Sequence, residues 1–96
     1  MLINDSMAIV RMARVKVYST AVCPVCDNTR QLLKRWHIPF DEVLVDVDRG
    51  ALREFLEITQ GARTVPQITI DGKWIGSFWE LTEMHMEGAL DELVEA

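Results

Sequence analysis

Ser19-Thr20-Ala21-Val22-Cys23-Pro24-Val25-Cys26 is the stretch of sequence that decides the fold, and it holds both cysteines of the 96-residue chain. It follows an apolar run at 15–18 and precedes a helical pattern. The first N–H groups of a helix lack backbone partners, and the helix dipole makes that end partly positive, which favours a thiolate. We therefore expect Cys23, at the N-cap before Pro24, to be the reactive sulfur. Cys26 should lie one turn inward, less accessible and within disulfide reach.

Three interpretations of this cysteine pair are open. Half of a zinc site would need two more ligands, and the two histidines, His37 and His85, are too far apart for the usual finger spacing. A structural disulfide across so short a loop would add little stability and is typical of cysteine-rich secreted scaffolds. We favour a reversible redox pair, because Cys-x-x-Cys beside a strand-helix-strand pattern is its usual signature. No metal site is predicted.

The composition is that of a globular domain, with 49% hydrophobic and 26% charged residues. No apolar run approaches the ~20 residues that span a bilayer, and residues 1–14 lack the apolar segment of a signal peptide. We therefore predict no membrane association and a cytoplasmic location, where a cysteine pair is usually reduced and catalytic. The net charge of −5 argues against a nucleic-acid partner. We expect a poorly ordered N-terminal extension at 1–14 and one domain at 15–96.

Apolar periodicity predicts alternating strands and helices in the first two thirds of the domain: a strand at 15–19, a helix at 24–36, a strand at 40–48 and a helix capped by Asp48 that runs through Gln60. β-branched and aromatic residues favour the first strand, and alternating valines favour the second. Gly61 would supply a left-handed stop for the second helix. Its apolar stripe is expected at Leu52, Phe55, Leu56 and Thr59.

The last third of the sequence predicts a hairpin and two helices. Short strands at 67–70 and 73–76 surround Asp71-Gly72, a typical two-residue turn. Ser77 and Glu80 form a capping box for the next helix, and Gly88 separates it from a short final helix at 89–94. A strand-helix-strand order implies a parallel first pair with a right-handed crossover. The predicted fold class is α/β: β-α-β-α-β-β-α with a short C-terminal helix, and a four-stranded mixed sheet flanked by helices.

Three segments resemble the signatures of the glutaredoxins, a family with the thioredoxin fold. They are Val17-Tyr18-Ser19 with the Cys23–Cys26 loop, then Gly61-Ala62-Arg63-Thr64-Val65-Pro66-Gln67-Ile68, and then Ile75-Gly76-Ser77-Phe78-Trp79-Glu80-Leu81. The resemblance covers about residues 15–95. Three motifs in the right order are more specific than Cys-x-x-Cys alone. The resemblance implies a thioredoxin-like fold for the domain and a Cys-Pro-Val-Cys active site.

The resemblance also implies a glutathione site. In the family, the proline that matches Pro66 is cis and lies beside the nucleophilic cysteine, so the backbone of Val65 should meet the cysteinyl part of glutathione; an ordinary trans proline at a strand start is the alternative. Arg53 occupies a position where the family binds the glycine carboxylate, although it is equally typical of a solvated helix face. The candidate glutathione residues are Thr64, Val65, Pro66, Arg53, Gly76, Ser77 and Trp79.

Three positions depart from the family pattern. Thr20 replaces a usual Lys, Val25 a usual aromatic residue, and Trp79 the Asp or Ser that meets the γ-glutamyl group. Loss of the Lys removes one charge-assisted contact to glutathione and one source of thiolate stabilisation. The helix start at Ser77 still offers N–H groups to an anion. Core packing is the alternative role for Trp79.

Together these features predict a glutathione-dependent thiol-disulfide oxidoreductase that reduces protein disulfides and glutathione mixed disulfides through Cys23 and Cys26. Glutathione is the expected co-substrate, no cofactor is expected to be tightly bound, and a monomer should act on disulfide-containing or glutathionylated proteins. One alternative is a glutaredoxin-like redoxin reduced by thioredoxin reductase, which would supply electrons to an enzyme such as ribonucleotide reductase. Another is an iron–sulfur cluster shared by two subunits through Cys23 and glutathione.

Overall fold

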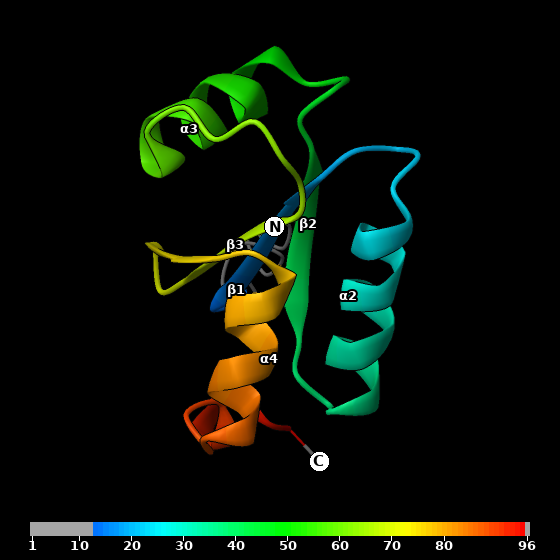
Figure 1. Cartoon of the computed structure of the whole chain (residues 1–96), viewed down its shortest axis with the longest axis vertical. Helices are drawn as coiled ribbons and strands as arrows, with labels where there is room; N and C mark the ends of the chain where they lie inside the picture. Colours follow the sequence, from blue (N-terminus) through cyan, green and yellow to red (C-terminus); the bar gives the residue numbers. More distant parts are fainter. Residues whose placement is uncertain (1–12, 96) are drawn as a thin grey trace, which may run out of the picture.

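Four strands, three α-helices and one 3₁₀ turn make up residues 13–95, which are the residues that the computed structural model describes (Figure 1). The element order is the predicted one. Residues 1–12 of the expected N-terminal extension lie outside the described residues. The elements are β1 (Val15–Ser19), α2 (Pro24–Arg35), β2 (Phe40–Leu44), α3 (Arg49–Thr59), β3 (Gln67–Ile70), β4 (Lys73–Gly76), α4 (Phe78–Met86) and η1 (Asp91–Leu93).

The strands form one mixed sheet in the order β2-β1-β3-β4. β1 is parallel to β2, as the crossover through α2 requires, and antiparallel to β3. β3 and β4 form the predicted hairpin, in which Asp71 and Gly72 take the positive φ angles, 53° and 82°, of a tight turn. The predicted thioredoxin-like α/β fold is therefore confirmed.

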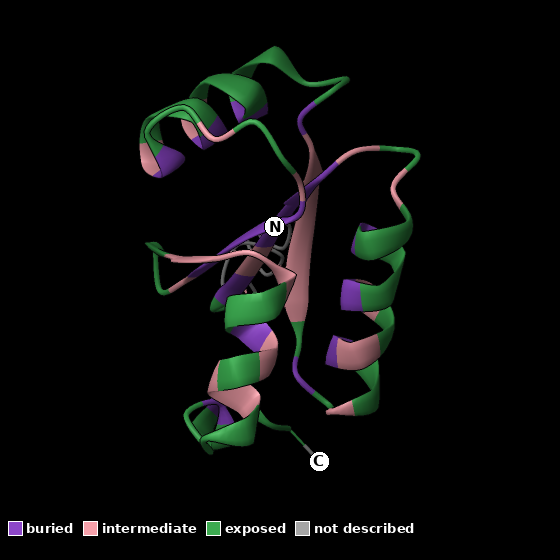
Figure 2. Cartoon of the chain, in the orientation of Figure 1, coloured by how far each residue is buried: buried purple, intermediate pink, exposed green. Residues whose placement is uncertain are grey.

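Each face of the sheet has its own apolar cluster, because successive side chains of a strand point to opposite faces. Val15 and Val17 of β1 pack with Leu33 of α2 and Leu81 of α4, whereas Tyr18 packs with Phe55 of α3. In Figure 2 the buried positions of α2 face the middle of the molecule, and its exposed positions face outward. Helices α2 and α4 therefore cover one face, and α3 covers the other.

The second strand is shorter than predicted, because it ends at Leu44 rather than at residue 48. The N–H groups of Val47 and Asp48 both donate to the Leu44 carbonyl and close a turn. Val47 is consequently 72% exposed. Asp48 then caps α3 as expected, by accepting a hydrogen bond from the N–H of Ala51 at 3.0 Å. The alternation of valines continues past the strand into this turn.

The predicted apolar stripe of α3 is only half right. Phe55 is buried and lies 5.9 Å from the Tyr18 ring, but Leu52 and Leu56 are 39% and 42% exposed. The buried partner in the first turn is Ala51, because the turn after β2 fixes the rotation of the helix. At its end, Gln60 takes the left-handed conformation together with the expected Gly61.

The C-terminal segment differs from the prediction in length. A single 3₁₀ turn, η1, replaces the final helix expected at 89–94. Leu90 and Leu93 are buried in the α2–α4 face as expected, whereas Val94 is 47% exposed. Arg14, which we assigned to the extension, forms ion pairs with both Asp71 and Glu92. It therefore links η1, which contains Glu92, to the turn of the β3–β4 hairpin, which contains Asp71.

Candidate active site

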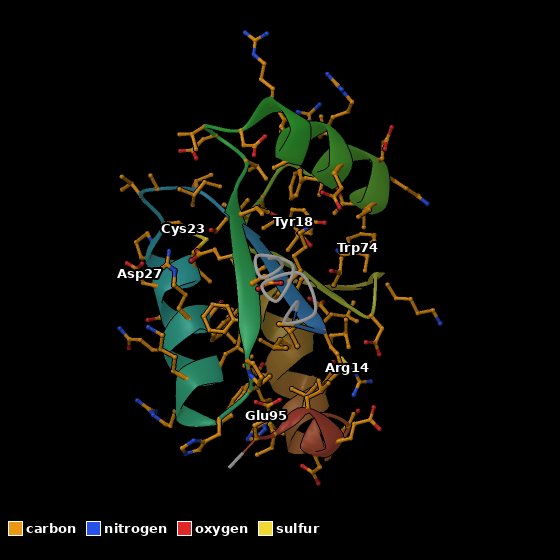
Figure 3. The ribbon with its side chains drawn as sticks, turned by 180° about the vertical axis from the view of Figure 1, so that it is seen from behind. Arg14, Tyr18, Cys23, Asp27, Trp74 and Glu95 are labelled. Atoms are coloured by element: carbon orange, nitrogen blue, oxygen red, sulfur yellow. A yellow bond between two sulfur atoms is a disulfide. The ribbon has the colours of Figure 1, made fainter. Side chains whose placement is uncertain are left out.

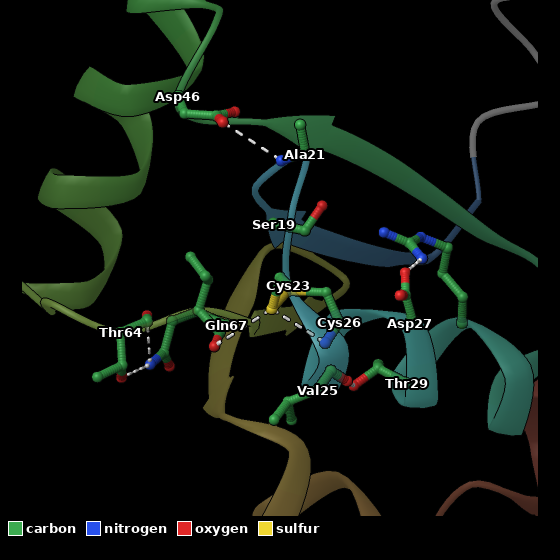
Figure 4. Close-up of a disulfide and its surroundings, with 12 residues drawn as sticks. Ser19, Ala21, Cys23, Val25, Cys26, Asp27, Thr29, Asp46, Thr64 and Gln67 are labelled. Carbon is green, nitrogen blue, oxygen red and sulfur yellow. Dashed lines mark hydrogen bonds and ion pairs between the residues drawn. A yellow bond between two sulfur atoms is a disulfide. The ribbon is translucent and has the colours of Figure 1, made fainter.

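Cys23 is the N-cap of α2 and is joined to Cys26 by a disulfide (Figure 4). The backbone of Cys23 is extended, with φ −157° and ψ 102°, and Pro24 opens the helix behind it. The N–H of Cys26 points at the Cys23 sulfur, 3.1 Å away. That N–H is one of the orphan donors of the helix end, and it would remain in place to stabilise a thiolate after reduction.

The two sulfurs differ in exposure. Cys26 is fully buried, with 0% of its surface exposed, whereas Cys23 is partly exposed. An attacking thiolate must approach the disulfide along the S–S axis from outside the molecule. Only Cys23 offers such an approach from solvent, and this agrees with the order of reactivity expected from the sequence.

The loop before β3 lies against Cys23. The Val65–Pro66 bond is cis, as the resemblance implied, and Pro66 is buried. The carbonyl oxygen of Val65 is 3.9 Å from the Cys23 sulfur. Because the backbone of Val65 runs past the sulfur, a thiol-bearing peptide held along this loop would bring its own sulfur to Cys23.

A cavity of about 450 Å³ opens beside this loop. It brings together three of the candidate glutathione residues, Thr64, Gly76 and Ser77. The other residues of its wall are Gln67, Trp74, Ile75 and Glu80. In Figure 3, Cys23 and Trp74 lie at the same end of the sheet as α3, on either side of Tyr18.

Trp74 and Gln67 are wall residues that sequence reasoning missed. The indole Nε1 of Trp74 donates to the Gln67 side-chain oxygen at 2.8 Å, and the Gln67 amide nitrogen donates to the Thr64 carbonyl at 3.1 Å. This chain of hydrogen bonds fixes an indole that is 43% exposed as one side of the cavity. The sequence feature that could have indicated a binding role for Trp74 is an aromatic residue on a short edge strand, two positions before Gly76.

The start of α4 contributes a carboxylate to the same cavity. Glu80 accepts hydrogen bonds from the N–H and the hydroxyl of Ser77, both at 2.7 Å, so the predicted capping box is present. These donors lower the pKa of Glu80 below its ordinary value. A Cβ at Gly76 would lie 2.6 Å from Glu80 Cγ, so only glycine fits there without displacing this side chain. The Ser77 N–H that we expected to be open to an anion already has a partner.

Arg53 and Trp79 are not among the residues that line this cavity. Arg53 is exposed on α3. Trp79 is 72% exposed and packs edge-on against Phe78, with ring centroids 5.2 Å apart, so the core role considered for Trp79 is wrong. Both side chains lie on the surface, and Trp79 is the second residue of α4, after Phe78.

The charged side chains in the first two turns of α2 form ion pairs within the fold. Asp27, directly after Cys26, forms an ion pair with Arg30, and the same guanidinium binds Glu42 at 2.7 Å. Because Arg30 already has two carboxylate partners, it adds little positive potential at the sulfurs. The helix end is therefore the main source of thiolate stabilisation that the described residues provide.

The family model for glutaredoxins matches residues 15–75. The chain belongs to the glutaredoxin family. Glutaredoxin 3 of Escherichia coli (strain K12) is 36% identical over 84 residues, which are 88% of this chain and 100% of that protein. A glutaredoxin of Pseudomonas aeruginosa is 38% identical over 85 residues, again 88% and 100% of the two chains.

Solved glutaredoxins share the fold of this one. The holo form of glutaredoxin C1 from a Populus hybrid superposes with a TM-score of 0.70 at 31% identity, covering 84% of this chain and 82% of that one. A buckwheat glutaredoxin, solved as a complex with glutathione, gives 0.73 at 25% identity, covering 94% and 84%. The glutaredoxin described here is a thiol-disulfide oxidoreductase with Cys23 and Cys26 as its redox pair. In residues 13–95, no helix is long and apolar enough to cross a membrane.

Proposed function

We propose that this glutaredoxin uses glutathione to reduce protein disulfides and glutathione mixed disulfides. The observation that carries the proposal is the cavity beside the loop that carries Val65: Thr64, Gly76 and Ser77 line this cavity. In the same loop, the Val65 carbonyl oxygen is 3.9 Å from the Cys23 sulfur. A tripeptide laid along Val65 would place its cysteinyl sulfur at Cys23 and one of its ends in this cavity. The buckwheat relative bound to glutathione supports the same assignment.

The proposed cycle is a series of thiol–disulfide exchange steps. The Cys23 thiolate attacks the glutathione sulfur of a mixed disulfide, the S–S bond breaks, and the protein thiol leaves with a proton from solvent. The glutathione now bound to Cys23 is released either by a second glutathione, which forms glutathione disulfide, or by Cys26, which forms the intramolecular disulfide. Two glutathione molecules then reduce that disulfide and leave as glutathione disulfide.

The cavity wall favours a ligand with an ammonium group at this end. Glu80 is the charged group of the wall, and its lowered pKa keeps it ionised at neutral pH. The γ-glutamyl end of glutathione carries both an ammonium and a carboxylate. We propose that the ammonium meets Glu80 while the carboxylate competes with Glu80 for the donors of Ser77. Arg53 and Trp79 remain candidate contacts at the rim of the site.

A second candidate is reduction by thioredoxin reductase. The observations that favour it are the missing Lys at Thr20 and the Ser77 N–H already bonded to Glu80, because both weaken charge recognition of glutathione. In this case the same Cys23–Cys26 pair would accept electrons from a protein rather than from glutathione. We propose the cytoplasm as the location and the monomer as the active form in either case.

The deciding experiment measures NADPH consumption with the mixed disulfide of glutathione and 2-mercaptoethanol as substrate. One reaction contains glutathione and glutathione reductase, and the other contains thioredoxin reductase alone. Turnover in the first reaction is expected. Turnover in the second reaction only would replace the proposal by the thioredoxin-reductase alternative.

A further inference from the structure

A second cavity, of about 280 Å³, lies between α2 and α4. We call it the α2–α4 groove, and its lining residues are Asn28, Gln31, Leu32, Arg35 and Phe78. The four α2 residues are spaced by three and four positions, so they share one face of that helix. Phe78 is the first residue of α4 and faces them from the other side. The two helices contact one another, and in the view of Figure 1 they run roughly parallel on either side of β2.

The groove lies on the face of α2 that carries Val25, two residues after Cys23. One turn before Asn28, the same face of α2 carries Val25, which is 42% exposed and precedes the buried Cys26. Figure 4 shows the Val25 side chain pointing away from the disulfide. Val22, on the other side of Cys23 in the sequence, is 90% exposed. Cys23 therefore has an exposed valine close to it on either side in the sequence, and one of these, Val25, lies on the α2 face that lines the groove.

The start of α4 separates the two cavities. Ser77 lines the cavity that we assign to glutathione, and its neighbour Phe78 lines the α2–α4 groove. A mixed disulfide has two halves, and when Cys23 attacks the sulfur of one half, the other half leaves. If glutathione occupies the first cavity, the polypeptide half must lie on another surface near Cys23. The groove is the candidate, because its first lining residue, Asn28, follows Cys23 by five positions.

We infer that the α2–α4 groove binds the polypeptide half of the mixed disulfide, an inference that rests on the proposed function. The segment is extended, with an apolar side chain against Leu32 and Phe78 and a carboxylate at Arg35. Leu32 and Arg35 follow Cys23 by nine and twelve positions, which is about 14 and 18 Å of helix. An extended chain covers those distances in about four and about five or six residues.

The charge of the groove selects the partner. Arg35 is exposed, and the ion pairs found in residues 13–95 use Arg14, Lys16 and Arg30 rather than Arg35. Its guanidinium therefore offers a carboxylate a bidentate site at the end of an otherwise apolar and amide-lined groove. Glutathione itself is too short to reach from Cys23 to Arg35. The groove distinguishes polypeptide substrates and leaves glutathione unaffected.

The test uses short peptides with one cysteine, each linked to glutathione by a disulfide. One peptide carries leucine and aspartate about four and six positions after the cysteine, so that both side chains point to the same side of an extended chain, and a second carries lysine in place of the aspartate. A further pair places the same residues before the cysteine, because the groove accepts either chain direction. Protein reduced beforehand and freed of reductant reacts once, so that its two thiols become the disulfide while the peptide and glutathione leave as thiols.

We expect the wild-type rate constant to be about two- to five-fold higher with the aspartate peptide than with its lysine counterpart, the range of an exposed ion pair. Arg35→Glu should invert that preference. Lys34→Glu, the same charge change on the neighbouring exposed residue outside the groove, should keep it. Phe78→Ala should slow both peptides but not the mixed disulfide of glutathione and 2-mercaptoethanol, which is too small to enter the groove.

Three outcomes would overturn the inference. Arg35→Glu could leave the preference unchanged, or it could slow the small substrate as much as the peptides, which would place its effect at Cys23. Ultracentrifugation could instead reveal a wild-type dimer that Arg35→Glu dissociates, which would make a second copy the occupant. A single turnover needs neither glutathione reductase nor thioredoxin reductase. The peptide preference can therefore be interpreted even if glutathione proves not to be the electron donor.

Discussion

The polar cluster beneath the active-site loop gives a sharp prediction for Glu42→Ala. Ser19 is fully buried, and its hydroxyl donates to Glu42 at 2.5 Å. Nε of Arg30 donates to both oxygens of the same carboxylate, at 2.8 and 2.7 Å. Alanine at 42 would leave the Ser19 hydroxyl buried without this partner, and it would leave Arg30 with only Asp27. The protein should therefore lose stability while its sulfur chemistry is spared.

The size of the loss follows from burial. An unsatisfied buried hydroxyl costs ~1–3 kcal/mol. The side chains of Arg30 and Glu42 are 24% and 23% exposed, so their ion pair is partly screened and adds ~0.5–1 kcal/mol. We expect a total of ~1.5–4 kcal/mol, or a fall in Tm of about 6–30 °C for a domain of this size. Ser19→Ala in the Glu42→Ala background should restore part of the loss, because it removes the orphaned hydroxyl.

Urea unfolding of the oxidised protein measures this, with an unchanged m value as the check that the unfolded state is the same. Glu92→Ala is the matched control: its carboxylate binds Arg14 at 3.0 Å, but the two side chains are 71% and 48% exposed. That substitution should cost no more than ~0.5 kcal/mol. Equal losses for Glu42→Ala and Glu92→Ala would refute the reasoning, as would a double variant with Ser19→Ala that is no more stable than Glu42→Ala alone.

Three further predictions concern the site itself. Cys26→Ser should keep reduction of small glutathione mixed disulfides, because a second glutathione can resolve the adduct on Cys23, and should lose single-turnover oxidation to the internal disulfide; loss of both activities would reverse the assigned roles. Thr20→Lys should lower the pKa of Cys23 and raise its thiolate absorbance at 240 nm near pH 6, whereas an unchanged titration would mean that residue 20 is too far away. Glu80→Gln should destabilise the protein above pH ~5. Because the donors at Ser77 lower the folded pKa of Glu80, that stability is present above the unfolded pKa and is lost as pH falls through the folded pKa. Wild type and variant should therefore converge in thermal melts as the pH falls below the ordinary range of a glutamate pKa; a pH-independent gap would contradict it.

Local signals in the sequence predicted the features that depend on nearest neighbours. The N-cap at Cys23, the turn at Asp71 and the capping box at Ser77 each depend on residues within four positions, and each is present. The resemblance supplied what local signals do not contain, namely that the loop with the cis Val65–Pro66 bond lies beside Cys23 although the two are more than forty residues apart. Motif order identified the fold because the family fixes those long-range contacts.

The features that the sequence did not reveal depend on how helices and strands are rotated in space. In the sequence, Leu52 and Leu56 fit the spacing of an apolar stripe as well as Ala51 and Phe55 do. The turn after β2 determines that Ala51 and Phe55 are the pair on the side of Tyr18. The role of Trp74 required knowing that its edge strand borders the cavity. The burial of Ala51 and Phe55 and the position of Trp74 at the cavity are both set by how the helices and strands pack, and not by the residue types themselves.

Three features of this chain act in one direction, and two of them, Thr20 and Trp79, are departures from the family pattern. Thr20 brings no charge, the Ser77 N–H is bonded to Glu80, and Trp79 places an exposed indole where a small polar residue is usual. Each feature weakens polar recognition of glutathione, whereas Val22 and Trp79 are exposed apolar side chains, 90% and 72% exposed. Apolar contacts strengthen binding of a polypeptide, which can cover them, more than binding of a tripeptide. The ratio of kcat/KM for an apolar glutathionylated peptide to kcat/KM for a small mixed disulfide should therefore fall when Trp79→Asp and Thr20→Lys restore the family residues, mainly through a lower KM for glutathione and for the small substrate.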